Sequence, residues 1–368
     1  MTGTTTTEKA DLLSMTPDEV AEFLSSLGEP KYRAKQIFGW MHRGEDFDGM
    51  TNISKKLRET LKEKAVVNIP TVEEKLVSKI DGTIKYLFGL SDGNVIESVF
   101  MRYKHGNTIC ISSEVGCPMG CKFCASTIGG LVRGLAPSEL LGQVIAAEKD
   151  TGERISNIVM MGIGEPLDNY DNTVKFLRLV GDPDGLNIGS RHISVSTCGL
   201  VDKIDELSKL DLGITLSISL HAADDETRSS IMPVNKRWGV SELLDACRRY
   251  FAATGRRISF EYTLISGKND SPEDARHLAS ALKHGLYRKS ESFPIHVNLI
   301  PVNEVAETGF KRSGADAVKR FADELGRQGI NATVRRRLGS DINASCGQLR
   351  RNKMLADGSL GGIQETLV

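Results

Sequence analysis

Hydrophobic and polar residues follow different periods in different parts of the chain. In the first part, apolar positions recur at helical spacing. Residues 16–19 read Thr-Pro-Asp-Glu, a capping box with proline at the first helical position, and apolar residues follow on one helix face. Two further stretches, 32–42 and 54–64, have the same period. The pattern predicts a small helical unit before residue 70.

The period changes to two from about Glu74 onward. Three alternating runs follow one another, and Asp81-Gly82 and Asp92-Gly93 separate them. An Asp-Gly pair between alternating runs is a strong short-range signal for a β-hairpin. This part is predicted to be an antiparallel meander.

In the rest of the chain, strand-like runs alternate with helix-like runs. The predicted strands are 107–112, 155–161, 192–197, 213–220, 257–264 and 294–300, and the helices that follow them are 137–149, 172–180, 201–210, 240–253, 272–282 and 315–327. Such alternation is typical of parallel βα units. Six units are too few for a closed eightfold barrel, so we expect an α/β fold with a partial (β/α)6 TIM-like barrel. Its chemistry should lie at the carboxyl ends of the strands.

These periods divide the chain into four expected parts. They are an N-terminal helical domain (1–70), an antiparallel β extension (71–104), the barrel (105–340) and a C-terminal segment (341–368).

Charge and composition exclude some classes of protein. The chain has 368 residues, with 47 Lys and Arg against 48 Asp and Glu, so affinity for a polyanion must come from local basic clusters. One such cluster is 31–64, although ordinary solvated helix faces would look the same. No secretion signal or apolar membrane span is recognisable, and 7 Cys are too sparse for a disulfide scaffold. We expect a cytoplasmic protein.

The sharpest chemical signal is a cysteine cluster after the first barrel strand. Cys117, Cys121 and Cys124 form a CxxxCxxC pattern among glycine and proline. Three thiolates at this spacing can converge on one metal centre. A structural zinc site is the alternative, but it requires a fourth ligand, and no nearby Cys or His supplies one. A four-iron cluster with three thiolate ligands would keep one iron open.

This motif resembles the signature of the radical S-adenosylmethionine (radical-SAM) enzymes. The resemblance implies a [4Fe-4S] cluster whose open iron binds SAM and cleaves it to a 5′-deoxyadenosyl radical. By the same resemblance, Gly164 and Glu165 of the GEP motif bind SAM, together with residues at later strand ends: Ser196, Ser219, Leu220, His221 and Asn298. Read alone, the GEP motif would be a tight turn with a solvated acid.

Two more cysteines narrow the resemblance to one branch. Cys110 lies shortly before the cluster motif, and Cys346 lies in a segment flanked by Arg335–Arg337 and by further basic residues. A positive field favours the thiolate nucleophile at Cys346. This pair resembles the radical-SAM RNA adenine methyltransferases, most closely the dual-specificity RlmN enzymes. Cys198 and Cys247 are expected to be buried small hydrophobic residues.

The resemblance implies the catalytic roles. Cys346 takes a methyl group from one SAM, and a second SAM generates the radical that activates this group for addition to carbon 2 of adenine. Cys110 then attacks the sulfur of Cys346, which leaves a disulfide, and Glu97 accepts the carbon 2 proton. Glu97 lies in an otherwise apolar strand, where partial burial would suit a base, although an exposed strand residue is the alternative.

The implied substrates are an adenosine of 23S rRNA in the peptidyl-transferase centre and the adenosine 3′ of the anticodon in a subset of tRNAs. Both must be unstacked, and basic residues would hold their phosphates. An electron donor such as flavodoxin or ferredoxin is implied, and we expect a monomer. Two alternatives remain: methylation of carbon 8, which in related proteins gives antibiotic resistance, and a non-catalytic metal-stapled RNA-binding protein.

Overall fold

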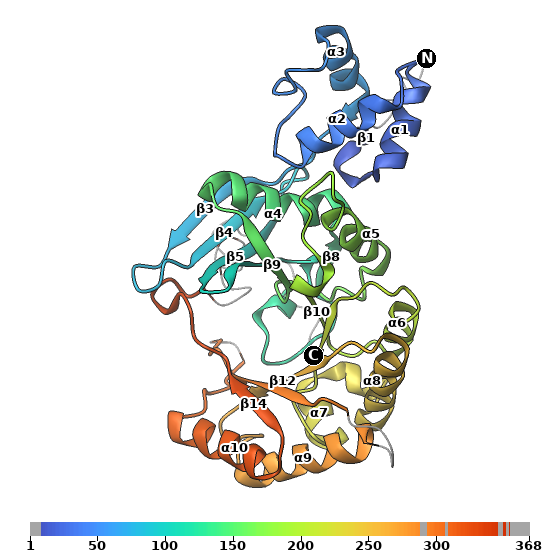
Figure 1. Cartoon of the computed structure of the whole chain (residues 1–368). Helices are drawn as coiled ribbons and strands as arrows, with labels where there is room; N and C mark the ends of the chain where they lie inside the picture. The colour runs from blue at the N-terminus through green and yellow to red at the C-terminus, as the bar shows by residue number, and fades with distance from the viewer. Residues whose placement is uncertain (1–8, 288–292, 306–307, 345–348, 351–352, 354–368) are drawn as a thin grey trace, which may run out of the picture.

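One ten-stranded sheet, with helices packed against it, organises the molecule (Figure 1). The computed structural model describes residues 9–287, 293–305, 308–344, 349–350 and 353. The strand order of the sheet is β14-β13-β12-β11-β10-β9-β6-β5-β4-β3.

The strands of the main sheet are β3 (Thr71–Val77), β4 (Ile84–Gly89), β5 (Val95–Tyr103), β6 (Gly106–Cys110), β9 (Ile155–Met160), β10 (Ile193–Thr197), β11 (Thr215–Ser219), β12 (Ile258–Leu264), β13 (His296–Pro301) and β14 (Asn331–Val334). Two small sheets pair β1 (Ala10–Asp11) with β2 (Ala65–Val66), and β7 (Glu114–Gly116) with β8 (Leu131–Gly134).

The α-helices are α1 (Pro17–Ser26), α2 (Tyr32–Met41), α3 (Lys55–Lys64), α4 (Pro137–Thr151), α5 (Tyr170–Val180), α6 (Val201–Leu207), α7 (Asp225–Ile231), α8 (Val240–Thr254), α9 (Pro272–Leu286) and α10 (Ala315–Arg327). Short 3-10 helices are η1 (Leu12–Ser14), η2 (Ala125–Thr127), η3 (Ser190–His192), η4 (Pro233–Lys236) and η5 (Ser340–Ile342).

The N-terminal helical unit forms as its sequence predicts. The capping box is closed in both directions, because Glu19 N donates to Thr16 Oγ1 at 3.3 Å and Thr16 N donates to the Glu19 carboxylate at 2.7 Å. Such caps stabilise a helix by about 1 kcal/mol. Helices α1, α2 and α3 lie together at one end of the molecule (Figure 1).

The predicted meander is confirmed, and it belongs to the same sheet as the barrel strands. Strands β3, β4, β5 and β6 pair antiparallel in chain order. Asp81-Gly82 and Asp92-Gly93 lie in the two connecting turns, where Gly82 and Gly93 have φ of 71° and 82°. A positive φ is inexpensive only for glycine, which is why these dipeptides mark the turns.

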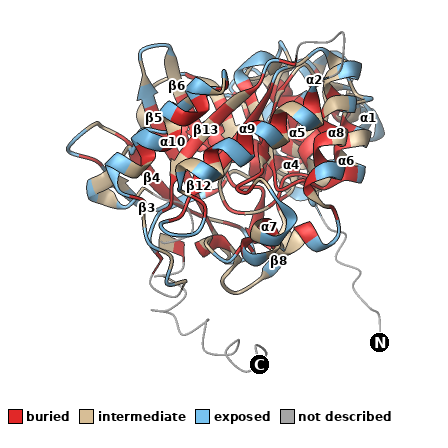
Figure 2. Ribbon diagram, turned by 90° about the horizontal axis from the view of Figure 1, so that it is seen from below, coloured by how far each residue is buried: buried red, intermediate tan, exposed pale blue. Residues whose placement is uncertain are grey.

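The predicted partial barrel is also confirmed. Strands β6 and β9–β13 pair in parallel, and β14 adds a seventh parallel strand at the edge of the sheet. The barrel stays open because β14 and β3 lie at opposite ends of the strand order. Figure 2 shows buried strands enclosed by helices whose outer faces are exposed.

The division of the chain at residues 70, 104 and 340 stays a prediction. Within the described part of the chain, no helix has the length and apolarity that a membrane crossing requires.

Candidate active site

The cysteine cluster motif lies in the loop between β7 and β8. This loop starts with Gly116, which has φ 85°, and a Cβ atom there would lie 1.9 Å from the carbonyl oxygen of Gly130. Only glycine allows the two arms of the hairpin to approach so closely. Inside the loop, Lys122 N donates to Ile231 O at 2.9 Å, which joins the cysteines to the end of α7.

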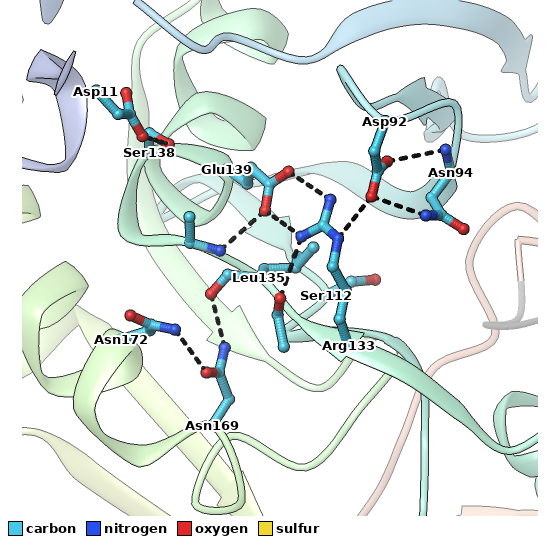
Figure 3. Close-up of polar contacts among 12 residues, drawn as sticks. Asp11, Asp92, Asn94, Ser112, Arg133, Leu135, Ser138, Glu139, Asn169 and Asn172 are labelled. Atoms are coloured by element: carbon cyan, nitrogen blue, oxygen red, sulfur yellow. Dashed lines mark hydrogen bonds and ion pairs between the residues drawn. The ribbon is translucent and has the colours of Figure 1, made fainter. Parts of the chain in front are cut away.

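Arg133 anchors the outgoing arm of this loop (Figure 3). Its guanidinium donates to both carboxylate oxygens of Glu139, at 2.7 and 2.8 Å, and to Asp92 at 2.6 Å. Glu139 also accepts from Ala136 N at 2.9 Å, and Ser138 Oγ donates to Asp11 at 2.5 Å. The network therefore connects β8, the start of α4, the β4–β5 turn and the N-terminal unit.

The three cysteines of the motif open into one cavity of about 210 Å³, which we call the strand-end cavity. Its other walls come from the carboxyl ends of β9, β10, β11, β12 and β13, as expected for a barrel-type site. Its lining includes most of the predicted site residues: Cys117, Cys121, Cys124, Gly164, Glu165, Ser196, Ser219 and His221.

The GEP turn directly follows β9. Gly164 has φ 108°, and a Cβ there would lie 2.7 Å from Glu114 N, so the turn requires glycine. The Glu165 carboxylate accepts from Cys198 N at 2.7 Å and from Leu167 N at 3.0 Å. Burial raises the pKa of Glu165 above its ordinary value, although these backbone donors counteract the shift. Glu165 is thus a buried carboxylate held by neutral donors, not the solvated acid of the alternative interpretation.

The strand ends after β10 and β11 bring the next group together. Ser196 Oγ lies 3.4 Å from Ser219 Oγ. His221 is buried in a left-handed conformation with φ 57°, and its Nδ1 accepts from Thr263 N at 2.9 Å. Burial and the charge of Arg228 lower the pKa of His221 to about 3, so the ring is neutral.

Leu220 and Asn298 lie beside the strand-end cavity instead of lining it. Leu220 is fully buried, and its carbonyl accepts from Arg228 Nε at 2.9 Å. Asn298 borders a neighbouring cavity of about 370 Å³, and its amide donates to Glu261 Oε2 at 2.6 Å. Glu261 lines the strand-end cavity, so this hydrogen bond connects Asn298 to the cavity wall.

A second cavity of about 240 Å³, which we call the Cys110 cavity, adjoins the first. Phe123, Cys124 and Met161 line both cavities. Arg312 and the run Arg335–Arg337 give the Cys110 cavity a strongly basic wall. Cys110 itself is buried beside Val99 and Met101, and Leu338 and Ala344 pack against these residues.

Glu97 is buried, as one of the two interpretations of its strand expected. It is about 1% exposed and forms an ion pair with Lys85, which is equally buried, at 3.0 Å. Glu97 lies two residues before Val99, the register partner of Cys110, so alternation puts Glu97 and Cys110 on one face of the sheet.

The C-terminal segment contacts this same face. Glu97 accepts from Arg350 N at 2.6 Å, and Lys85 donates to Asn343 O at 3.1 Å. Cys346 lies outside the described residues, so the expected Cys110–Cys346 disulfide has no support in the structure. None of the six described cysteines is joined to another.

The donor set of the strand-end cavity suits an iron–sulfur cluster. Within the described ranges, no three His, Cys, Asp or Glu side chains are grouped closely enough to hold a single metal ion. The thiolates of a four-iron cluster bind different irons, so they line a cavity instead of meeting at a point. Burial raises the pKa of Cys117 and raises that of Cys121 to about 12, a cost that binding to iron removes. Buried Glu165 equally suits a cationic amino group such as that of SAM.

The partial barrel, with a three-cysteine loop and a GEP turn at its strand ends, defines a radical-SAM enzyme. Residues 111–279 match the family model of the radical SAM superfamily, and residues 10–67 match that of the ribosomal RNA large subunit methyltransferase N-terminal domain. A crystal structure of a radical SAM methyltransferase from Sphaerobacter thermophilus superposes with a TM-score of 0.86 at 43% identity. The superposition covers 92% of this chain and 98% of the Sphaerobacter chain.

The chain belongs to the family of RlmN dual-specificity RNA methyltransferases. It is 53% identical to the "Probable dual-specificity RNA methyltransferase RlmN" of Alkaliphilus oremlandii, across 94% of this chain and 99% of that protein. It is 52% identical to the protein of the same name from Clostridium novyi, across 93% and 98%. The enzyme is therefore a radical-SAM RNA methyltransferase that uses a [4Fe-4S] cluster and SAM, and the non-catalytic alternative is wrong.

Sequence reasoning missed three buried charged residues around the strand-end cavity. Glu114 lies on β7, Arg228 on α7 and Glu261 on β12. Glu261 had a usable signal, because it is a single acid within an apolar strand of a barrel whose interior is lined by alternate residues. Arg228 had none, since a seven-residue segment rich in Ser, Asp and Glu looks like a solvated surface.

Proposed function

We propose that this enzyme methylates carbon 2 of adenosine in 23S rRNA and in a subset of tRNAs, through a methylated Cys346 and a transient crosslink to RNA. The observation that carries this proposal is the shared face of Cys110 and Glu97, onto which the C-terminal segment folds. Ala344 packs against the Cys110 group and Arg350 N bonds Glu97, and Cys346 lies between them in the sequence. This arrangement supports a role for all three side chains at one reaction centre.

Each residue has a distinct task in the proposed reaction. Cys117, Cys121 and Cys124 would hold the cluster at the strand-end cavity. With SAM, the cluster would supply the radical that activates the methyl group on Cys346. Addition of the methylene radical to carbon 2 leaves one unpaired electron on the adduct, which would return to the cluster that SAM cleavage has oxidised, and Glu97 accepts the proton that carbon 2 loses. Cys110 then attacks the sulfur of Cys346. An S–S bond forms as the S–CH2 bond breaks, and the released carbon takes the electron pair and a proton to become the methyl group.

The basic wall of the Cys110 cavity supports RNA as the substrate. Arg312, Arg335, Arg336 and Arg337 line it, and charge repulsion from Arg337 adds to burial in lowering the pKa of Arg312. Phosphates would relieve this repulsion, and binding should weaken as salt rises. We propose in addition a monomer in the cytoplasm and a flavodoxin-like or ferredoxin-like electron donor, as the family implies.

Mass spectrometry of nucleosides from RNA treated with the reconstituted enzyme tests the position of methylation. We expect 2-methyladenosine, and 8-methyladenosine as the product would refute carbon 2 as the target.

Cys110→Ala tests the crosslink, because without its thiol the protein–RNA adduct should form but not resolve. The adduct should appear as a band that nuclease treatment removes. Cys346→Ala should cleave SAM yet give neither adduct nor product. Cys247→Ala is the control, since this thiol is buried in α8 and should leave product formation intact. Free, unmodified RNA from the Cys110 variant would contradict its role.

A further inference from the structure

Arg228 is a fully buried arginine on α7, the helix whose last residue accepts a hydrogen bond from the cysteine motif. Among the described residues, it is the largest side chain that is completely buried. Its guanidinium donates to Leu220 O at 2.9 Å, to Cys198 O at 2.6 Å and to Ser219 O at 3.2 Å. Its remaining partner is Asn235 Oδ1, at 2.9 Å. These acceptors lie at the ends of β10 and β11 and in η4.

All these acceptors are uncharged. No carboxylate of the described residues forms a direct ion pair with the guanidinium; Asp225, whose charge acts on it, bonds instead to the amide of Asn235 at 3.0 Å. A buried charge without a counter-charge costs several kcal/mol. Burial lowers the pKa of Arg228, but arginine remains protonated in proteins. A positive charge therefore remains under the strand-end cavity.

The cysteine motif packs on the same part of the chain. Lys122 N donates to Ile231 O, three residues after Arg228. A Cβ at Gly120 would lie 3.5 Å from Pro233 of η4, and Met232 lines the strand-end cavity. Negative charge on Cys198, Cys121 or Asp225 would stabilise the guanidinium. Cys121 is one of the proposed cluster ligands.

We propose that Arg228 is the buried counter-charge of the iron–sulfur cluster and raises the potential at which the cluster accepts its electron. The inference rests on the proposed ligands Cys117, Cys121 and Cys124. One electron enters from an external low-potential reductant, no bond forms or breaks, and no proton moves. The cluster with its thiolates gains one negative charge, which a nearby buried cation stabilises. Arg228 acts through the cluster and is a positioning residue, not a catalytic one.

The test is a reductive titration of the reconstituted full-length enzyme, without RNA, followed by electron paramagnetic resonance. Arg228→Gln removes the charge and keeps an amide that can donate to the carbonyls. It should lower the reduced-to-oxidised ratio at a fixed potential about tenfold, which corresponds to about 59 mV for one electron. Arg228→Lys keeps the charge and should stay close to the parent enzyme. Arg249→Gln is the control, because Arg249 is half-exposed and pairs with Asp205 at 2.7 Å.

Two outcomes would overturn the proposal. One is an unchanged potential in Arg228→Gln; the other is an equal shift in Arg228→Lys, which would mean that the hydrogen bonds matter and the charge does not. If Arg228→Gln is insoluble, Asn235→Asp replaces it. This change puts a carboxylate 2.9 Å from the guanidinium and should lower the potential in the same way, so no shift there overturns the proposal as well.

Failure of the ligand assignment gives a different result. Cys121→Ala should lose iron and sulfide. Full iron content in that variant would refute the assignment, whereas a normal cluster with an unchanged potential in Arg228→Gln refutes only the role of Arg228.

Discussion

Charged side chains have different kinds of partners around the strand-end cavity and in the antiparallel extension. Around the cavity, the charged groups are bound by neutral partners. Arg228 is held by carbonyl and amide oxygens, Glu165 by backbone N–H groups, and Glu261 by Asn298 and Ser259. Burial raises the pKa of Glu261, as it does that of Glu165.

In the extension, opposite charges meet directly. Lys85 pairs with Glu97 in the interior, and nearer the surface Arg102 pairs with Glu153 and Lys75 with Asp150. Arg133 bridges Asp92 and Glu139 in the same manner.

The difference separates a region built for stability from one built for ligands. In the extension the charges are compensated within the protein, which gives a firm surface for the C-terminal segment. Around the cavity, the proposed cluster and SAM would supply the compensating charges. Buried charges without partners are costly, and such groups concentrate at functional sites.

The largest expected effect comes from breaking the Lys85–Glu97 pair. Lys85→Met should lower the free energy of unfolding by about 3–5 kcal/mol, because it removes the Lys85 cation from beside the buried Glu97 carboxylate. Chemical denaturation of the full-length protein measures this loss.

The double variant Lys85→Met/Glu97→Gln is the control, because it removes both charges and should recover most of the lost stability. A loss below about 1 kcal/mol in the single variant, a value typical of exposed pairs, would show that the extension does not depend on this pairing.

A smaller effect is expected from pH at Glu114 beside the cavity. Burial raises the pKa of Glu114 from 4.5 to about 8, and the nearby Asp168 and Glu165 charges add to it. The folded state thus binds a proton that the unfolded state releases. The stability that Glu114 contributes is complete below pH 4.5 and is lost as pH rises towards 8.

The difference between the parent and Glu114→Gln isolates this contribution. Relative to that variant, the parent should lose about 1 kcal/mol or more of unfolding free energy between pH 5 and pH 8. If the unfolding free energies of the two proteins changed with pH in parallel, the pKa of Glu114 would not be raised in the folded state. That result would weaken the contrast between the two regions.

The same contrast explains what the sequence could predict. The cysteine spacing, the GEP turn and the Thr16 capping box are local signals, because their chemistry depends on residues a few positions apart. Burial of Glu97 was one of two interpretations of its apolar strand, and its partner Lys85 depends on the β4–β5 register, which no local pattern fixes. The charge of Arg228 depends on carbonyls of Cys198 and Ser219, which only the fold brings near.

Irregular pieces were missed for a related reason. Strand β14 is four residues long, mostly exposed, and stabilised by its pairing with β13. The β7–β8 hairpin is shorter still on one side and surrounds the cysteine loop. These strands are too short to show an alternating apolar pattern, so their structure depends on pairing with other strands of the fold.

The smallest expected effect concerns how the extension holds Gly339, just before the C-terminal segment. Asp81 accepts from Gly339 N at 2.9 Å and from Thr83 N at 3.0 Å. Burial alone would raise the pKa of Asp81, but these donors outweigh it and lower the pKa to about 2. The bond to Gly339 should therefore persist above pH 4 and weaken as the pH falls towards 2.

Asp81→Asn should cost less than about 1 kcal/mol of global stability and speed hydrogen exchange near residue 339. Asp18→Asn on α1 is the control, and equal exchange near residue 339 in both variants would mean that Asp81 does not hold this part of the chain.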